Sequence, residues 1–363
     1  MILRTRLALV LLACVATAPA FAQSQPSPPP AAPKAAPKPA PDPPLRRWFE
    51  FQQFTLSTRY RFIENNKDVT TSNQEQYKES VRARVNLDPR KRYTVNMGFF
   101  TGATFTSSWN NLGIGNNTVF VGKDHYFKQF YAAAAPITGL EFHYGGIYAN
   151  RGETDEWVGF DDDNYLVGER VSVRRPKELF LDELTVTRAA IGPLAPANLG
   201  RRWDGLKNPN FTQVLGVKRF NQRVSGSLEY NRQIGADILR AAVTLHFSAK
   251  APLSTVRYEQ YRRVNLNAAS GFSLWADRPI TKYVRLQGGY VAVDQFYGGW
   301  NADKMQSGRR FFLNATIPIY GPLCAAVYVT RALDAPYAVP IDRRFDAMVT
   351  YDVLNTLRRT GIF

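Results

Sequence analysis

Arginine and lysine recur at every second position in several segments of this chain, where they alternate with apolar residues. Rings of such cations favour anions, because a wall of low dielectric constant focuses their field and raises the local anion concentration. The chemistry that these residues predict is therefore the passage or binding of anions. The set comprises Arg59, Arg61, Lys78, Arg82, Arg84, Arg170, Arg174, Arg223, Arg240, Arg257, Arg285, Arg310 and Arg344.

The same cations have a second interpretation, in which they pair with interior carboxylates such as Glu183, Glu229 and Glu259 and fill a narrow interior. The chain has 46 Lys and Arg residues against 30 Asp and Glu residues, so pairing would leave part of the positive charge free. Selectivity is expected to depend mainly on Arg59, Arg82, Arg84 and Arg174.

Residues for catalysis or metal binding are few. The three histidines, His125, His143 and His246, have no metal-ligand spacing, and no nucleophile elbow or phosphate-binding glycine loop occurs. We therefore expect no enzyme activity, no metal and no cofactor. One enzyme hypothesis stays open, a lipid-modifying barrel that uses His143 or His125 with a nearby serine.

The alternation itself predicts the elements that position the cations. From about Phe49 to Val353 the period is two residues, as in β-strands with one polar and one apolar face. An arginine that faces hydrocarbon at the membrane midplane costs roughly 2 to 4 kcal/mol, so the charged face should point inward. The predicted fold is an all-β transmembrane antiparallel β-barrel with a wet, positive lumen.

A secreted β-sandwich or β-helix would alternate as well. Such a protein buries its apolar face in a core, whereas aromatic residues here gather toward strand ends, as an interfacial girdle requires. Examples are Tyr93, Phe142 and Tyr290. The barrel is therefore the favoured architecture.

The N-terminus predicts export. Residues 1–22 have a basic start, an apolar stretch and Ala20-Phe21-Ala22 before Gln23, as in a cleaved signal peptide; a lipobox ending at Cys14 is the alternative. Loss of this segment leaves a net charge near +14. So basic a chain could bind nucleic acid, but an exported chain is not expected to do so. Residues 23–45 are rich in Pro, Ala and Lys and predict a disordered periplasmic spacer before a barrel of residues 46–363.

Short and long connections alternate along the barrel segment, as in barrels with short periplasmic turns and longer outer loops. Seven turns and eight loops predict about sixteen strands, with fourteen or eighteen as alternatives. The turns are expected at residues 88–90, 136–139, 175–177, 220–222, 250–252, 277–279 and 318–322. The loops are expected at residues 64–74, 109–124, 151–164, 189–210, 233–236, 263–267, 295–307 and 333–342.

From Trp48 to Phe363 the chain resembles sixteen-stranded Gram-negative porins in architecture, including its terminal Phe363, which would be an assembly signal for the barrel-assembly machinery. One departure is that alternation weakens after Val353, so either Phe363 closes a bent final strand or a short periplasmic tail follows the barrel. The resemblance implies contacts with outer-membrane lipids and lipopolysaccharide, and a homotrimer by analogy alone.

Porins of this class commonly fold their third loop into the channel. The resemblance therefore suggests that the acidic residues of this loop face the arginines across a constriction; they are Asp155, Glu156, Asp161, Asp162 and Asp163. A solvated loop, or one that binds divalent cations among lipopolysaccharide phosphates, is the alternative.

The functional hypothesis is an outer-membrane channel for passive diffusion of small anionic or neutral hydrophilic solutes, biased toward anions. The main alternative is a non-conducting barrel that anchors or scaffolds a surface or periplasmic partner. The lipid-modifying enzyme is the third hypothesis.

Overall fold

The computed structural model describes residues 47–102, 107–115, 125–154, 165–174, 180–191, 199–248, 251–265, 268–294, 307–334 and 341–360. The predicted signal peptide and spacer, the acidic residues of the third loop and Phe363 all lie outside these ranges.

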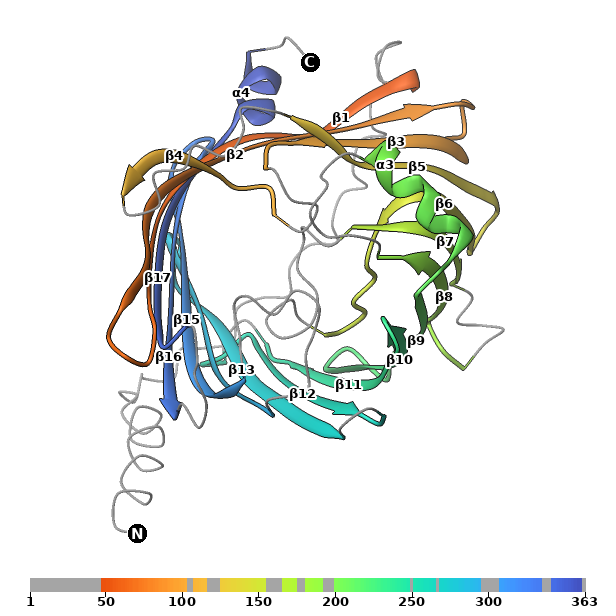
Figure 1. Ribbon diagram of the computed structural model, residues 1–363. Coiled ribbons are helices and arrows are strands. Elements are labelled where there is room, and N and C mark those ends of the chain that lie inside the picture. Colours follow the sequence, from red (N-terminus) through yellow and green to blue (C-terminus); the bar gives the residue numbers. More distant parts are fainter. Residues whose placement is uncertain are drawn as a thin grey trace, which may run out of the picture. The chain divides into compact units, whose positions relative to one another are not determined.

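The described residues form one closed antiparallel sheet (Figure 1). Each strand pairs with its neighbours, and β1 also pairs with β17, which closes the barrel. The strands are β1 (Phe49–Glu64), β2 (Thr70–Asn86), β3 (Tyr93–Phe100), β4 (Asn110–Gly115), β5 (Tyr126–Ile137), β6 (Leu140–Tyr148), β7 (Tyr165–Val173), β8 (Glu183–Ala190), β9 (Phe211–Arg219), β10 (Val224–Gln233), β11 (Ala236–His246), β12 (Thr255–Arg263), β13 (Ala269–Thr281), β14 (Val284–Val293), β15 (Gly308–Tyr320), β16 (Leu323–Asp334) and β17 (Arg343–Asp352).

β3 and β4 share one place in the wall. β3 pairs with residues 80–86 of β2, and β4 pairs with the next part of the same strand, at residues 74–77. Together they form one interrupted strand, so the seventeen strands make a 16-strand barrel, as the alternation predicts.

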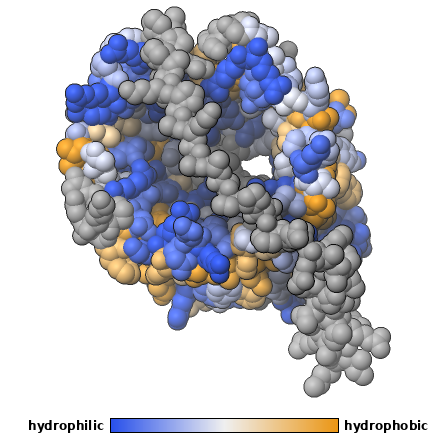
Figure 2. Space-filling model, turned by 180° about the vertical axis from the view of Figure 1, so that it is seen from behind, coloured by the Kyte–Doolittle hydropathy of each residue, from blue (hydrophilic) through white to orange (hydrophobic). Residues whose placement is uncertain are grey.

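Burial in the wall is the reverse of that in a soluble protein. In β11, Leu239 and Val243 are 40% and 44% exposed, whereas Arg240 and Thr244 are 2% and 0% exposed. Figure 2 looks into the barrel, where hydrophilic surface lines the interior and hydrophobic surface gathers on the outer wall. The polar face of the strands therefore points inward, as expected when the outer surface must face lipid.

Several predicted connections are wrong in detail. In the predicted turns at residues 136–139 and 318–322, β5 extends to Ile137 and β15 to Tyr320, so each turn is shorter than predicted. Residues 277–279 are not a turn but part of β13, and the connection to β14 is Lys282 and Tyr283. Pro279 fits inside the strand because the pairing with β14 is irregular between Pro279 and Thr281, where a missing N–H group is tolerated. The predicted loop at residues 233–236 is only Ile234 and Gly235, both with positive φ, as in a tight hairpin.

Other predicted loops contain regular structure. β2 begins at Thr70 inside the first predicted loop, and β4 lies inside the second. The β8–β9 connection contains α3 (Leu199–Arg202) and η1 (Trp203–Lys207), where Leu199 packs with Phe100 and Val167. No helix in the described ranges is long and apolar enough to cross a membrane.

The last strand is followed by a helix. β17 ends at Asp352, whose carboxylate accepts a hydrogen bond from the Asn355 N–H group and so caps α4 (Val353–Arg359). The Arg358 guanidinium donates to the Phe51 carbonyl oxygen at 3.2 Å, which fixes α4 beside β1. Of the two alternatives for this segment, the described residues show a tail outside the sheet.

Candidate functional site: the inner wall of the barrel

The predicted cations lie on the inner wall, but they do not form one ring. They divide into several groups, each held by a different carboxylate or by backbone oxygens. The groups differ in how much of each arginine side chain is exposed to the lumen. This exposure determines which arginines can contact a solute.

The first group surrounds Asp346 on β17. Arg61 donates two hydrogen bonds to its carboxylate, at 3.0 and 3.2 Å, and Arg344 donates to it at 2.7 Å. A third guanidinium, that of Arg59, lies 3.8 Å from the same carboxylate and 4.0 Å from the Trp109 ring. This arrangement concentrates positive charge at one point of the wall, around a single acid.

The Trp109 ring comes from the break between β3 and β4, and Lys78 lies 5.9 Å from its centre. At the other end of the break, Thr101 donates to the Ser108 carbonyl oxygen at 2.8 Å. Since cations are attracted to the face of an indole ring, the interruption of the strand supplies an inner-wall partner for two of the predicted cations.

The second group lies toward the turns. Arg84 and Lys91 both donate to the Glu50 carboxylate near the start of β1. Arg82 is oriented differently, with its guanidinium 5.4 Å from the Phe100 ring. Glu50 was not among the predicted partners, because its contact with Arg84 depends on the register in which β1 pairs with β2.

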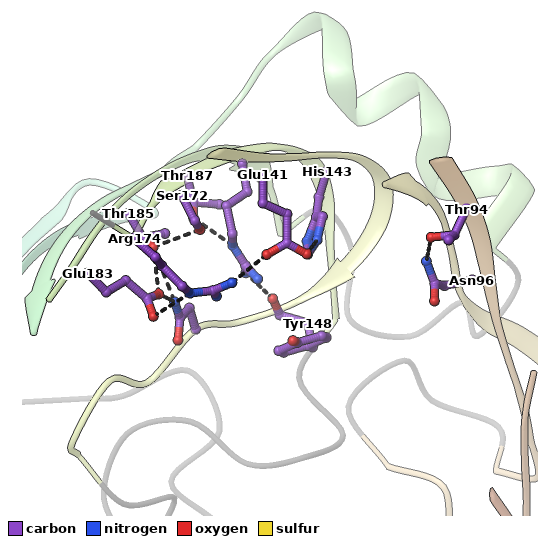
Figure 3. Close-up of polar contacts among 12 residues, drawn as sticks. Thr94, Asn96, Glu141, His143, Tyr148, Ser172, Arg174, Glu183, Thr185 and Thr187 are labelled. Atoms are coloured by element: carbon purple, nitrogen blue, oxygen red, sulfur yellow. Dashed lines mark hydrogen bonds and ion pairs between the residues drawn. The ribbon is translucent and has the colours of Figure 1, made fainter. Parts of the chain in front are cut away.

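The third group is drawn in Figure 3. The Arg174 guanidinium lies between two carboxylates and donates to Glu141 at 2.6 Å and to Glu183 at 2.9 Å. Arg170 lies deeper and donates to the Thr187 hydroxyl and the Tyr148 carbonyl oxygen. Its residue is 3% exposed, whereas the Arg174 side chain is 51% exposed, so only Arg174 is accessible from the lumen.

Among the remaining predicted cations, too, some are buried and some are exposed. Arg240 is buried against Glu229 at 3.4 Å, and Arg310 is buried and donates to the Ile341 carbonyl oxygen at 2.6 Å. By contrast, the Arg285 side chain is 62% exposed although it pairs with Asp277. The alternative interpretation, pairing with interior carboxylates, thus holds for Glu183 and Glu229, while Glu259 accepts hydrogen bonds from Tyr261 and Trp275.

The start of the third loop runs along the inner wall. After β6 the chain passes β8, where the Asn150 side chain donates to Glu183 at 3.0 Å, and β9, where Gln213 donates to the Asn150 carbonyl oxygen at 2.6 Å. The Glu153 N–H group then donates to the Ser227 hydroxyl of β10 at 3.1 Å.

Two further strands hold the next residues of this loop. The Glu153 carboxylate accepts a hydrogen bond from Thr244 of β11 at 3.0 Å and lies 3.6 Å from Arg257 of β12. Arg240 donates to the Thr154 hydroxyl at 2.7 Å. Residues 150–154 therefore cross the inner face of five strands, from β8 to β12, and Glu153 is a wall contact that the sequence did not indicate.

The histidines do not form the predicted pairs with serine. His143 contacts Glu141 at 2.7 Å, and His125 contacts Glu79. The histidine that contacts a serine is His246, whose Nε2 lies 3.1 Å from the Ser225 hydroxyl, without a carboxylate partner in the described ranges. Within those ranges no group of three or more His, Cys, Asp or Glu residues is placed to hold a metal ion.

Comparison with known proteins gives structural matches only. No protein-family model matches the sequence, and no curated protein does. Among solved structures, a complex of Salmonella typhi OmpF with daunomycin matches with a TM-score of 0.55 and 10% identity, over 84% of this chain and 97% of that one.

A triple mutant of the Rhodopseudomonas blastica porin matches with a TM-score of 0.52 and 10% identity, over 84% of this chain and 99% of that one. Another mutant of the same porin matches with a TM-score of 0.51 and 9% identity. At such identity the similarity is one of fold, and the fold is that of outer-membrane porins.

Proposed function

We propose that the protein is an outer-membrane channel for passive diffusion of small hydrophilic solutes. The observation that carries the proposal is the reversal of burial in a closed barrel of porin fold: apolar side chains cover the outside and charged side chains line the inside. An apolar outer wall needs lipid, and a charged inner wall needs water. The partners that follow are outer-membrane lipids, lipopolysaccharide and the barrel-assembly machinery.

The channel is biased toward anions in this proposal. Arg174 and Arg285 are the cations of these groups that solutes could meet, because their side chains are about half exposed or more, although carboxylates pair with both of them. Three guanidinium groups around the one carboxylate of Asp346 add to the positive potential of the wall. The solutes would be small anionic or neutral molecules.

A constriction by the third loop is also part of the proposal. The loop root at residues 150–154 follows the inner wall as far as β12, and this course supports the proposal. Acidic residues opposite the wall arginines would produce a transverse field that orients dipolar solutes.

The test is the reversal potential of the refolded protein in a planar bilayer under a KCl gradient. We expect stable conductance with chloride preferred over potassium. In the double variant Arg174→Gln/Arg285→Gln, the chloride-to-potassium permeability ratio should fall by roughly twofold or more, because two accessible lumenal charges are lost.

The matched control is Arg188→Gln/Arg232→Gln, which removes two charges from exposed arginines that pair with Glu169 and Asp237 outside the inner-wall groups. Its permeability ratio should equal that of the wild type. A folded barrel that conducts nothing would contradict the channel and favour a scaffold, or an enzyme if lipid turnover were detected.

We further propose that the protein forms a homotrimer through the outer face of β1, β2 and β17. Glu79 pairs in register with Leu56, which is 40% exposed on the outer wall, so the Glu79 carboxylate and its partner His125 face outward. Beside them lies a depression of about 270 Å³, bordered by Leu56, Tyr77 and Tyr351. A charged pair in mid-wall is better placed against a second protein surface than against lipid tails.

A further inference from the structure

Six cations gather on one arc of the rim at the turn end of the barrel, which we call the basic arc. Arg358 and Arg359 are in the last turn of α4, which contacts β1, and Arg359 lies beside Gly321 of the β15–β16 turn. Because β13 to β17, β1, β2 and β3 follow one another around the closed sheet, the β13–β14 turn, the β15–β16 turn, α4 and the β2–β3 turn lie in this order along the same rim. Its members are Arg47, Arg90, Arg278, Lys282, Arg358 and Arg359, all exposed.

Four carboxylates of the same arc are already engaged elsewhere. Glu50 binds Arg84 and Lys91, Asp277 binds Arg285, and Asp352 caps α4. Asp88 accepts hydrogen bonds from three backbone N–H groups of its own turn and contacts Arg92. In the described part of the chain, none of the six cations of the basic arc forms an ion pair.

The opposite rim is charged differently. There Arg343 contacts Glu64, Asp68 and Asp342, and Arg309 binds Asp334. Exposed cations without an ion pair in the described ranges also occur at this rim, at Lys67, Arg262 and Arg331, but they are on separate strands and connections.

Exposed apolar and aromatic side chains lie directly beside the basic arc. The Arg47 guanidinium is 5.9 Å from the centre of the Trp48 ring, and the Lys282 ammonium is 4.7 Å from the centre of the Tyr283 ring. Tyr320 is 84% exposed in the neighbouring turn region. Amphipathic rings and long basic side chains in this combination are typical of the boundary between lipid tails and headgroups.

We propose that the basic arc binds the phosphate groups of anionic phospholipids in the leaflet on the turn side of the barrel. Two of the cations lie against the rings of Trp48 and Tyr283, and such rings are typical of the level of the lipid headgroups, where the phosphates lie. A basic surface near an anionic leaflet attracts it strongly, and salt weakens the attraction. The inference rests on the membrane location proposed above.

The test measures lipid retained on the barrel by native mass spectrometry, after refolding in nanodiscs with equal amounts of phosphatidylglycerol and phosphatidylcholine of the same acyl chains. The wild type should retain phosphatidylglycerol in preference, and higher ionic strength should reduce the preference. The variant Arg278→Gln/Lys282→Gln/Arg359→Gln should lose it by roughly fivefold or more. Arg358 is kept, since it holds α4 to Phe51.

The matched control, Lys67→Gln/Arg262→Gln/Arg331→Gln, removes three exposed cations from the opposite rim and should retain the preference. Equal retention of both lipids by the wild type would overturn the proposal, as would an unchanged preference in the basic-arc variant. Cosedimentation with purified peptidoglycan that needs the three cations, without any lipid preference, would assign the arc to that polymer instead.

Conductance of the same preparations separates this result from the proposed function. A barrel that conducts but shows no lipid preference contradicts only the basic-arc proposal. A barrel that retains phosphatidylglycerol through these cations but does not conduct contradicts only the channel.

Discussion

The carboxylate of Asp346 is surrounded by the guanidinium groups of Arg59, Arg61 and Arg344, and its side chain is 9% exposed. A buried charge of one sign amid several of the other is tolerated only while the partners remain in place. The stability of this part of the wall therefore depends on one acid, whereas exposed pairs such as Arg309 and Asp334 contribute little.

We predict that Asp346→Asn lowers the free energy of unfolding by about 3 to 5 kcal/mol, because three like charges lose their common partner. The measurement is urea-dependent loss of the folded band in semi-native electrophoresis. Asp334→Asn, which breaks the exposed pair with Arg309 at the end of β16, should lower it by less than about 1 kcal/mol. Equal effects of the two substitutions would show that the Asp346 group is not a stabilising centre.

For single residues, the sequence predicted which wall of the barrel a side chain faces but not which residue it binds. Alternation put Arg61 and Arg240 on the inner wall correctly, since it depends only on the two-residue period. It could not predict that Arg61 binds Asp346, which is 285 residues away, or that Arg240 is buried under Thr154. Accessibility of each cation depends on strand register and on the third loop, and neither is encoded locally.

Among the elements, the start of the third loop is notable because residues 150–154 lie on the inner wall. Its root is held by hydrogen bonds to inner-wall side chains of β8 to β11, at Glu183, Gln213, Ser227, Arg240 and Thr244, and by an ion pair with Arg257 of β12. Such fixed contacts would keep a loop in place against the flow of solutes. The acidic segment that follows lies outside the described residues, so its location is tested by function.

We predict that neutralising the acidic segment raises the chloride-to-potassium permeability ratio by roughly twofold or more, because the constriction loses its negative side. The variant replaces Asp155, Asp161, Asp162 and Asp163 by Asn and Glu156 by Gln, and the measurement is the reversal potential in a KCl gradient. Asp204→Asn in the β8–β9 connection is the control and should leave the ratio unchanged. An unchanged ratio in the loop variant would place the acids away from the ion path.

The strands and connections show which parts of the fold a sequence pattern can predict. Long alternating strands such as β1 and β11 were predicted well, because many residues report the same period. Connections were predicted less well. Pro279 suggested a turn but lies at an irregular position of β13. Alternation also does not distinguish one continuous strand from the interrupted pair β3 and β4. α4 was missed as a helix because seven residues give too little periodicity.

For the whole molecule, the outer wall is not uniform around its circumference. Most of it carries exposed aliphatic and aromatic side chains, but the face around Glu79 and His125 carries a hydrogen-bonded carboxylate and a depression. A second exposed pair, Glu169 and Arg188, occurs on β7 and β8, far around the barrel. The face around Glu79 combines charge with a shape that another subunit could fill.

We predict that Glu79→Lys dissociates the homotrimer into monomers, because the carboxylate that contacts His125 is replaced by a lysine ammonium in every subunit of the interface. The dissociation constant should rise by roughly tenfold or more. The measurement is the mass of the detergent-solubilised protein by light scattering, and Glu169→Lys is the control that should stay trimeric. A monomeric wild type, or a trimeric Glu79→Lys variant, would contradict the proposed interface.

The pairing of the first strand with the last also determines when the barrel can form. The hydrogen bond between Ser57 and Thr350 joins residues 293 positions apart, and the whole β1–β17 ladder has a similar separation. Contacts of such long range form slowly, and until they form both terminal strands present unpaired backbone groups that can aggregate. Synthesis of nearly the entire chain must therefore precede closure, and the unfinished sheet needs protection throughout its passage to the membrane.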